Sequence, residues 1–232
     1  MRWTMPDRKP RAGFEVVCEL VFRPVAHVVA RALLPLRVPP PAVVLAGAAA
    51  GLAAAVEVGR GAYLAGALLL QLKTVLDNAD GQLARVSGRV TSFGRYLDSE
   101  SDLLVDAAVF AGLGLRVGPW AALAGFVLLT SVLSLNFNLE RIHRGAPAGV
   151  ADGSLLARVY GVVYGPQDRL AEAVVRNPSA RTVGVAANFG LSTQLAALGL
   201  CLALGHPGAH VGVVAICLAV LAVLMTIDRR KP

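Results

Sequence analysis

Long apolar segments alternate with short polar ones along most of the chain. Six segments come close to the length of about 20 mostly apolar residues that a membrane-spanning helix needs. They cover residues 41–57, 61–76, 103–115, 120–139, 183–204 and 211–227. The second and third segments are short, and they reach full length only if both helices continue into the charged stretch 77–102 between them. The pattern predicts an all-α integral membrane protein with six transmembrane helices.

A different pattern precedes the first span. Polar residues recur at every fourth position among apolar neighbours, at Glu15, Glu19, Arg23, His27 and Arg31. On a helix this spacing forms one polar stripe. It favours an N-terminal amphipathic helix lying in the membrane interface and kinked at Pro24. A core helix packed on the bundle fits the same pattern and stays open.

Composition and charge narrow the class of protein. Of the 232 residues, 56% are hydrophobic and only 16% are charged, whereas a soluble domain carries about 25% charged residues. An ordinary soluble domain and a disordered chain are therefore excluded. The net charge of +7 comes from Lys and Arg residues between the apolar runs, which argues against a nucleic-acid partner. The three cysteines lie in apolar contexts, where we expect packing residues.

The basic residues also predict the orientation in the membrane. They are concentrated in the segments 2–37, 85–95, 141–181 and 229–231, all on one side of a six-span arrangement. The other side holds only Arg60 and Arg116. Because positive charge gathers in cytoplasmic loops, we expect a multi-pass protein of the cell membrane with both termini in the cytoplasm.

Four aspartates stand between the second and third spans. Asp77 and Asp80 are three positions apart, and Asp98 and Asp102 are four apart, so each pair shares one helix face. A turn between the helices makes them antiparallel and lets the two pairs face each other. Such groups at a membrane boundary are costly and usually functional. Oxygen ligands favour Mg²⁺ or Mn²⁺, and two ions fit between two such pairs.

A less specific interpretation is that these aspartates only flank membrane helices. That accounts for one or two of them, but not for the small and basic residues placed among them. Gly81 and Gly94 permit close approach of a ligand to the backbone, and Arg85 offers a planar set of donors suited to phosphate. Metal ligands, glycines and an arginine together indicate a site for a polyphosphate ester.

The spacing resembles that of a known family. The pattern D-x-x-D-G-x-x-A-R-(x8)-G-x-x-x-D-x-x-x-D is that of the CDP-alcohol phosphotransferases, also called CDP-alcohol phosphatidyltransferases. The chain matches it at every defined position, which are Asp77, Asp80, Gly81, Ala84, Arg85, Gly94, Asp98 and Asp102. The six spans, the N-terminal helix and the cytoplasmic placement of the motif extend the resemblance over most of the chain.

The resemblance implies an enzyme of phospholipid biosynthesis. It would transfer a substituted phosphoryl group, in the leading interpretation phosphatidyl from CDP-diacylglycerol, to a small alcohol acceptor and release CMP. Metal ligands would be Asp77, Asp80, Asp98 and Asp102, with Asp102 also the general base. The CDP pocket would include Asp80, Gly81, Ala84, Arg85 and Gly94. Two Mg²⁺ or Mn²⁺ ions and a homodimer are further expectations.

We expect the chain to consist of two parts. Residues 1–40 would form a cytoplasmic tail and the amphipathic juxtamembrane helix. Residues 41–232 would form the six-helix catalytic domain, with a cytoplasmic connection at about 141–181. A cation transporter or channel using the aspartates, and a family-like scaffold without catalysis, are the alternative functions.

Several residues around the motif carry weaker predictions. We expect Lys73 and Asp106, one helical turn outside the aspartate pairs, to form an ion pair, and the alternative is that each lines the polar cavity separately. A phosphorylated acceptor would need an arginine cluster, for which the candidates are Arg141, Arg144 and Arg181. The polar residues Asn188, Ser192, Thr193 and Gln194 either face the cavity or bond between helices. His206 and His210 are expected in a solvated loop on the far side.

Overall fold

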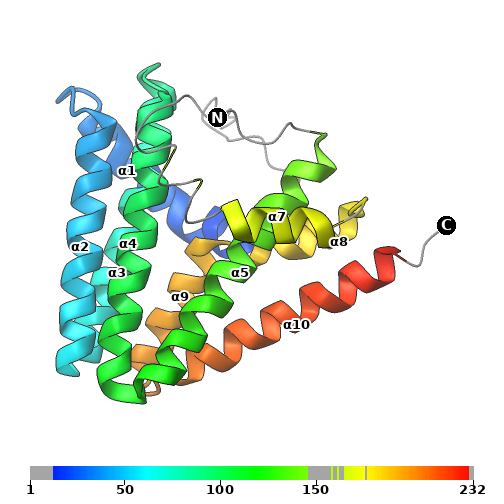
Figure 1. Ribbon diagram of the computed structural model, residues 1–232. Coiled ribbons are helices and arrows are strands. Elements are labelled where there is room, and N and C mark those ends of the chain that lie inside the picture. The colour runs from blue at the N-terminus through cyan, green and yellow to red at the C-terminus, as the bar shows by residue number, and fades with distance from the viewer. Residues whose placement is uncertain (1–12, 146–157, 159–160, 162–164, 176, 230–232) are drawn as a thin grey trace.

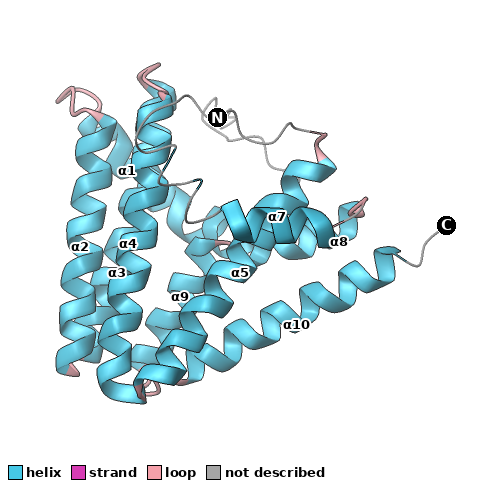
Figure 2. Ribbon diagram, viewed as in Figure 1, coloured by secondary structure: helices cyan, strands magenta, loops and turns pink. Residues whose placement is uncertain are grey.

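The computed structural model describes residues 13–145, 158, 161, 165–175 and 177–229. Within these ranges every regular element is a helix (Figures 1 and 2), so the all-α class is confirmed for them. In chain order they are η1 Cys18–Phe22, α1 Arg23–Leu33, α2 Pro40–Arg60, α3 Tyr63–Val86, α4 Ser92–Val117, α5 Pro119–His143, α7 Gly165–Val174, α8 Ala180–Ala186, η2 Ala187–Phe189, α9 Leu191–Ala203 and α10 Ala209–Arg229. The predicted tail 1–12 and much of the connection 141–181 lie outside the described residues.

Helix ends follow the local sequence. Pro40 occupies the first turn of α2, where its missing N–H costs nothing. The same helix ends at Gly61, whose φ of +83° is the left-handed conformation that glycine adopts easily. Thr91 caps α4 by accepting a hydrogen bond from Gly94 N at 3.0 Å. Gly118 then separates α4 from α5, which begins at Pro119.

The two short predicted spans do continue into the charged stretch. Helix α3 runs 24 residues to Val86, and α4 runs 26 residues from Ser92. The loop between them is short, so the helices lie antiparallel and side by side with α2 (Figure 1). The charged segment is thereby part of both helices, and the motif residues lie near the α3–α4 loop.

Three described helices, α2, α5 and α10, are long and apolar enough to cross a membrane. The pair formed by α8–η2 and α9 would be a fourth span if counted as one. Helices α3 and α4 have the length for a span, but they carry the charged motif. The chain is thus a helical membrane protein, while the six-span count stays a prediction.

The predicted span 183–204 is not one straight helix. It is bent by 44° between α8–η2 and α9, where Gly190 is extended with a ψ of 166°. The segment before η1 packs into this bend: Asn188 Nδ2 donates to Phe14 O at 3.0 Å, and Asn188 Oδ1 accepts from Val16 N at 2.9 Å. A side chain at position 190 would meet the Glu15 carboxylate, since an added Cβ would lie 2.9 Å from Oε1. The predicted span is therefore broken at Gly190, where the N-terminal segment packs against it, and its crossing of the membrane stays a prediction.

The polar stripe of the N-terminal helix faces the bundle from Glu15 to His27, whereas Arg31 at its end is exposed. Glu15 is buried and accepts from Thr193 Oγ1 at 3.1 Å, while His27 contacts Gln82 at 3.3 Å. The apolar residues on the opposite side are exposed, among them Leu20, Val21, Val25 and Val28. In a membrane protein such a face suits lipid. The π-helical turn η1 stands where a kink at Pro24 was expected, because a widened turn accommodates the missing N–H.

His210 departs from the sequence-based expectation. It is 1% exposed and belongs to the first turn of α10, with its ring centroid 6.1 Å from that of Phe110. The helix starts early enough to place His210 on the buried face with Val214 and Cys217. The solvated position expected for it was wrong, whereas His206 is exposed in the preceding loop.

Small residues let α2 approach its neighbours closely. Gly47, Gly51, Ala55 and Gly59 are spaced four apart on one face of α2. A Cβ added at Gly51 would collide with the side chain of Val105 in α4. This small-residue face brings backbones together in apolar surroundings, and α2 packs most extensively against α3 and α4.

We expect Gly51→Ala to destabilise the protein. At a solvent-exposed helix position, replacing glycine by alanine stabilises the helix by about 1 kcal/mol. At Gly51 the added methyl group would overpack against Val105, which costs about 1–3 kcal/mol. Thermal unfolding in detergent measures the difference. Gly212→Ala in α10 is the matched control because an added Cβ there meets nothing within 4 Å. Equal melting temperatures for Gly51→Ala and Gly212→Ala would contradict the close packing of α2 on α4.

Candidate metal and phosphate site

Three of the four predicted aspartates come together where α3 and α4 face each other. Asp77 from α3 and Asp98 and Asp102 from α4 each offer a carboxylate oxygen, and these oxygens lie within 4.8 Å of one another. All three residues are partly buried. The antiparallel arrangement predicted from the spacing is therefore the arrangement that gathers the carboxylates, and a cluster of oxygen ligands suits a hard divalent cation.

Asp80 lies one turn beyond Asp77 on α3 and is 6% exposed. Its Oδ2 is buried and has no hydrogen-bond partner among the described residues. A buried carboxylate oxygen without a partner carries an uncompensated desolvation cost. A cation beside Asp77 and Asp98 would compensate that cost. The donor set thus fits Mg²⁺ or Mn²⁺.

Lys73 is inserted between the two helices. Its side chain is 1% exposed, and its ammonium pairs with Asp77 Oδ2 and Asp102 Oδ1. The predicted ion pair between Lys73 and Asp106 is wrong. The ion-pair partners that the structure gives for Lys73 are Asp77 and Asp102. The aliphatic part of a lysine side chain is long enough to span one helical turn. The ammonium of Lys73 therefore reaches the aspartate cluster from the preceding turn of α3. Asp106 is buried one turn deeper in α4.

Gly47 of α2 forms the third wall of the cluster. A Cβ added at this position would lie 2.9 Å from Asp77 Oδ1. One oxygen of Asp77 therefore faces Lys73 and the other faces bare backbone on α2. Nothing in the α2 sequence points to this contact, since the glycine looks like one of several small residues in an apolar helix.

The remaining motif residues line the way from the loop to the carboxylates. Gly81, Ala84 and Arg85 follow Asp80 on α3, and all three are partly buried. The Arg85 guanidinium folds back toward Gly81, where an added Cβ would lie 3.2 Å from its Nη1. Gly94 sits in the first turn of α4. This placement puts a guanidinium and two glycines between the loop and the carboxylates.

Asn78, at a variable position of the motif, joins three segments. Its Nδ2 donates to Ser192 Oγ of α9 at 3.2 Å and to Thr74 O at 2.8 Å. Its Oδ1 accepts from Cys18 Sγ at 3.2 Å. Cys18 is buried as expected, but it is also a hydrogen-bond donor. For Ser192 the alternative of bonding between helices is correct.

Gln82 has a similar place one turn later. It is buried, contacts His27 and donates to Arg23 O at 3.3 Å. The face of α3 that carries Asn78 and Gln82 is thus held by η1, α1 and α9, while the face with the aspartates is turned to α4. The sequence does not reveal these contacts, because polar residues at variable motif positions look like solvent-facing ones.

Two of the arginines suggested for the acceptor pair with glutamates that do not belong to the aspartate cluster. Arg141 pairs with Glu172 of α7 and donates to Asn138 Oδ1 at 2.9 Å, and Arg144 pairs with Glu140. Arg181 is exposed on α8. Figure 1 shows α7 lying across α5, so the contacts of Arg141 belong to the docking of that helix.

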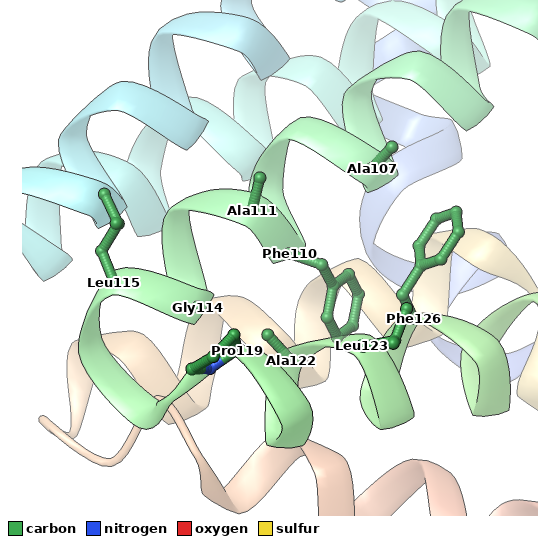
Figure 3. Close-up of a pocket in the computed structure, with 9 residues that line it drawn as sticks. All are labelled: Ala107, Phe110, Ala111, Gly114, Leu115, Pro119, Ala122, Leu123 and Phe126. Carbon is green, nitrogen blue, oxygen red and sulfur yellow. The ribbon is translucent and has the colours of Figure 1, made fainter.

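A hollow of about 430 Å³ lies between α4 and α5, toward the turn that connects them (Figure 3). Phe110 and Phe126 form one side of it, and its other lining residues are alanines, leucines, Gly114 and Pro119. None of these side chains can bind a phosphate or a cation. The hollow therefore offers no polar ligand for a metal or a phosphate and shares no residue with the carboxylate cluster.

Comparison with known proteins agrees with the geometry. A family model described as CDP-alcohol phosphatidyltransferase matches residues 27–227. The chain belongs to the CDP-alcohol phosphatidyltransferase family, and the resemblance inferred from the aspartate pattern is confirmed.

Individual relatives match over shorter stretches. The chain is 32% identical over 146 residues to a phosphatidylinositol phosphate synthase of Mycobacteroides abscessus, covering 59% of this chain and 64% of the relative. It is 38% identical over 83 residues to a bifunctional IPC transferase and DIPP synthase of Aquifex aeolicus, covering 35% and 19%. An archaetidylinositol phosphate synthase of Pyrococcus horikoshii is 44% identical over 48 residues, covering 21% and 26%. The chain thus spans less than two thirds of the length of each of these relatives.

One solved structure is also similar. It is the crystal structure of Mycobacterium tuberculosis phosphatidylinositol phosphate synthase with CDP-DAG bound. The two chains are 23% identical and superpose with a TM-score of 0.45, over 79% of this chain and 92% of the other.

We expect Gly47→Ala to weaken metal binding. The Cβ of the alanine would displace Oδ1 of Asp77. Disturbing the support of a metal ligand lowers the affinity for the metal by roughly 10-fold to 100-fold. Titration with Mn²⁺, followed by the electron paramagnetic resonance signal of the free ion, measures the affinity. Gly59→Ala on the same helix is the control, since its nearest neighbour would lie at an ordinary 3.4 Å. Identical Mn²⁺ affinities for the two variants would rule out a role for Gly47.

We expect Asn78→Ala to loosen the N-terminal segment from α3. The substitution leaves buried partners unsatisfied, which costs about 1–3 kcal/mol. Cys18, which is 1% exposed, should then react faster with a thiol reagent in detergent, as measured by mass spectrometry of its peptide. Cys217 serves as the internal reference. If Cys18 were labelled at the wild-type rate, the Asn78 contacts would not hold the N-terminal segment on α3.

Proposed function

We propose that the protein is a metal-dependent CDP-alcohol phosphotransferase that transfers a phosphatidyl group from CDP-diacylglycerol to an alcohol and releases CMP. The observation that carries the proposal is the meeting of Asp77, Asp98 and Asp102 across two helices, beside the unpartnered oxygen of Asp80. Membership in the phosphatidyltransferase family supports this reaction class. So do the curated relatives, which are named as synthases of phosphatidylinositol phosphate and related lipids.

The four aspartates would hold two divalent cations, Mg²⁺ or Mn²⁺. Bound there, these ions would neutralise the pyrophosphate of the donor and stabilise the charge that develops on it. Arg85 extends over Gly81 on the same side and would contact a phosphate oxygen through its planar guanidinium. Gly81, Ala84 and Gly94 would leave space for the nucleotide beside the backbone.

Asp102 would serve as the general base. In the transfer, the acceptor hydroxyl oxygen forms a bond to the phosphorus that carries diacylglycerol. The bond from that phosphorus to the bridging oxygen breaks, and CMP leaves with the electron pair. The hydroxyl proton passes to a carboxylate oxygen of Asp102. Because Lys73 occupies Asp102 Oδ1, Oδ2 is the oxygen available to the acceptor.

Inositol phosphate is the acceptor to test first, because several relatives are named for that product. Arg181 is exposed, whereas Arg141 and Arg144 pair with carboxylates, so Arg181 is the first of the suggested arginines to test. We further propose a homodimer in the cell membrane, with both termini and the carboxylate cluster on the cytoplasmic side. The excess of Lys and Arg in the loops of that side supports this orientation.

CMP release from CDP-diacylglycerol by the purified protein in detergent tests the proposed reaction. We expect release that requires Mg²⁺ or Mn²⁺, stops with a chelator and depends on one acceptor in a panel containing inositol phosphate, inositol, glycerol phosphate and serine. Removing a general base lowers the rate on the order of 100-fold to 10,000-fold, and Asp102→Asn should show this loss. Glu57→Gln is the control, because it also removes one negative charge but lies in the last turn of α2, outside the aspartate motif.

Two results would count against this proposal. The first is metal-dependent CMP release that persists in Asp102→Asn. The second is absence of release with every acceptor together with absence of metal-dependent binding of CDP-diacylglycerol.

A further inference from the structure

A buried ammonium stands among the carboxylates of the site. Lys73 is 1% exposed, so almost none of its charge is solvated by water, and isolated charges in such a place are very unfavourable. The pairs with Asp77 and Asp102 compensate that cost. Since the two partners come from different helices, Lys73 ties α3 to α4 at the level of the proposed metal ligands.

The contact uses half of each carboxylate. Lys73 takes Oδ2 of Asp77 and Oδ1 of Asp102. The second oxygen of each side chain stays outside this contact, and that of Asp77 is turned toward Gly47. A divalent cation can therefore bind to the cluster while Lys73 keeps its two partners. The ammonium limits the rotation of both carboxylates and fixes which oxygen each of them presents.

Charge balance supports the same role. The aspartates at positions 77, 80, 98, 102 and 106 carry five formal negative charges in two adjacent helices, and Lys73 reduces this to four. Two divalent cations would neutralise the four that remain. Without Lys73 the metal-free protein would lose a positive charge that is buried beside these carboxylates, and repulsion at short range in a low dielectric is strong.

We propose that Lys73 is a positioning residue that acts as a permanent internal cation of the carboxylate site. This role rests on the proposed function. Lys73 orients Asp102 toward the acceptor and Asp77 toward the metal, and it stabilises the cluster before metal binds. Lys73 does not reach the substrate, because its ammonium is enclosed by the two carboxylates that it holds. The role is therefore distinct from that of Arg85, which would contact the donor.

The test compares the wild type with Lys73→Met, which keeps a long apolar side chain and removes the charge. Thermal unfolding in detergent is measured in EDTA and in Mn²⁺, and Mn²⁺ affinity is measured by electron paramagnetic resonance. We expect Lys73→Met to lose stability in EDTA and to recover most of it in Mn²⁺, so that its Mn²⁺-induced shift exceeds that of the wild type. Its Mn²⁺ affinity should be no weaker than the wild-type value, because the positive charge of the ammonium no longer repels the ion.

Activity supplies the second signature. Misplacing a reacting group by about 1 Å costs on the order of 100-fold in rate, and we expect a loss of that size in the kcat of Lys73→Met. The KM for CDP-diacylglycerol should stay close to the wild-type value, because the substrate does not touch Lys73.

A double variant separates charge from position. Lys73→Met/Asp106→Asn restores the balance of four negative charges without restoring the link between Asp77 and Asp102. We expect its stability in EDTA to recover relative to Lys73→Met while its kcat stays low, and Asp106→Asn alone is the control. If Lys73→Met does not fold in EDTA, the double variant carries the test through its Mn²⁺ affinity and kcat.

Three outcomes would overturn the inference: an equal loss of stability in EDTA and in Mn²⁺, weaker Mn²⁺ binding, or an unchanged kcat. The first is the result expected of a lysine that only packs between helices. The stability and Mn²⁺ measurements need no turnover. They decide the role of Lys73 even if the protein releases no CMP, so failure of the proposed reaction and failure of this inference are distinguishable.

Discussion

The repulsion among the aspartates of α3 and α4 is the constraint on which the rest of the structure depends. Asp77, Asp98 and Asp102 bring carboxylate oxygens within 4.8 Å of one another in partly buried positions. Like charges at this range oppose each other strongly, so the helices that carry them must be held by other contacts. The close packing of α2 and the ion pairs of Lys73 are two of those contacts on the aspartate side.

The opposite face of α3 is held as firmly as the aspartate face. Asn78 and Gln82 anchor it to η1, α1 and α9 through hydrogen bonds. The same N-terminal segment fills the break between η2 and α9 at Gly190. Next to the break, the Asn188 side chain bonds to the backbone of that segment, at Phe14 O and Val16 N. One helix thus carries the charged groups on one side and their support on the other.

The second half of the bundle uses a different kind of contact. Asp168 of α7 accepts hydrogen bonds from Ser134 and Asn138 of α5, each at 2.9 Å. Arg141 and Glu172 extend this row of contacts between the same two helices. Polar side chains fix one helix on another where apolar surroundings provide little driving force for association. Arg141, one of the three arginines suggested for the acceptor, takes part in this docking of α7.

The sequence by itself determined the all-α class, the continuation of the two short spans into the charged stretch, and the facing aspartate pairs. These features depend on local spacing, because helical periodicity places residues three and four apart on one face. Family membership followed from the same spacing. Only the tertiary structure decided the bend at Gly190, the partners of Lys73, the contact of Gly47 with Asp77 and the burial of His210. Each of these depends on residues far apart in the chain, and no local pattern records which of several possible partners lies within reach.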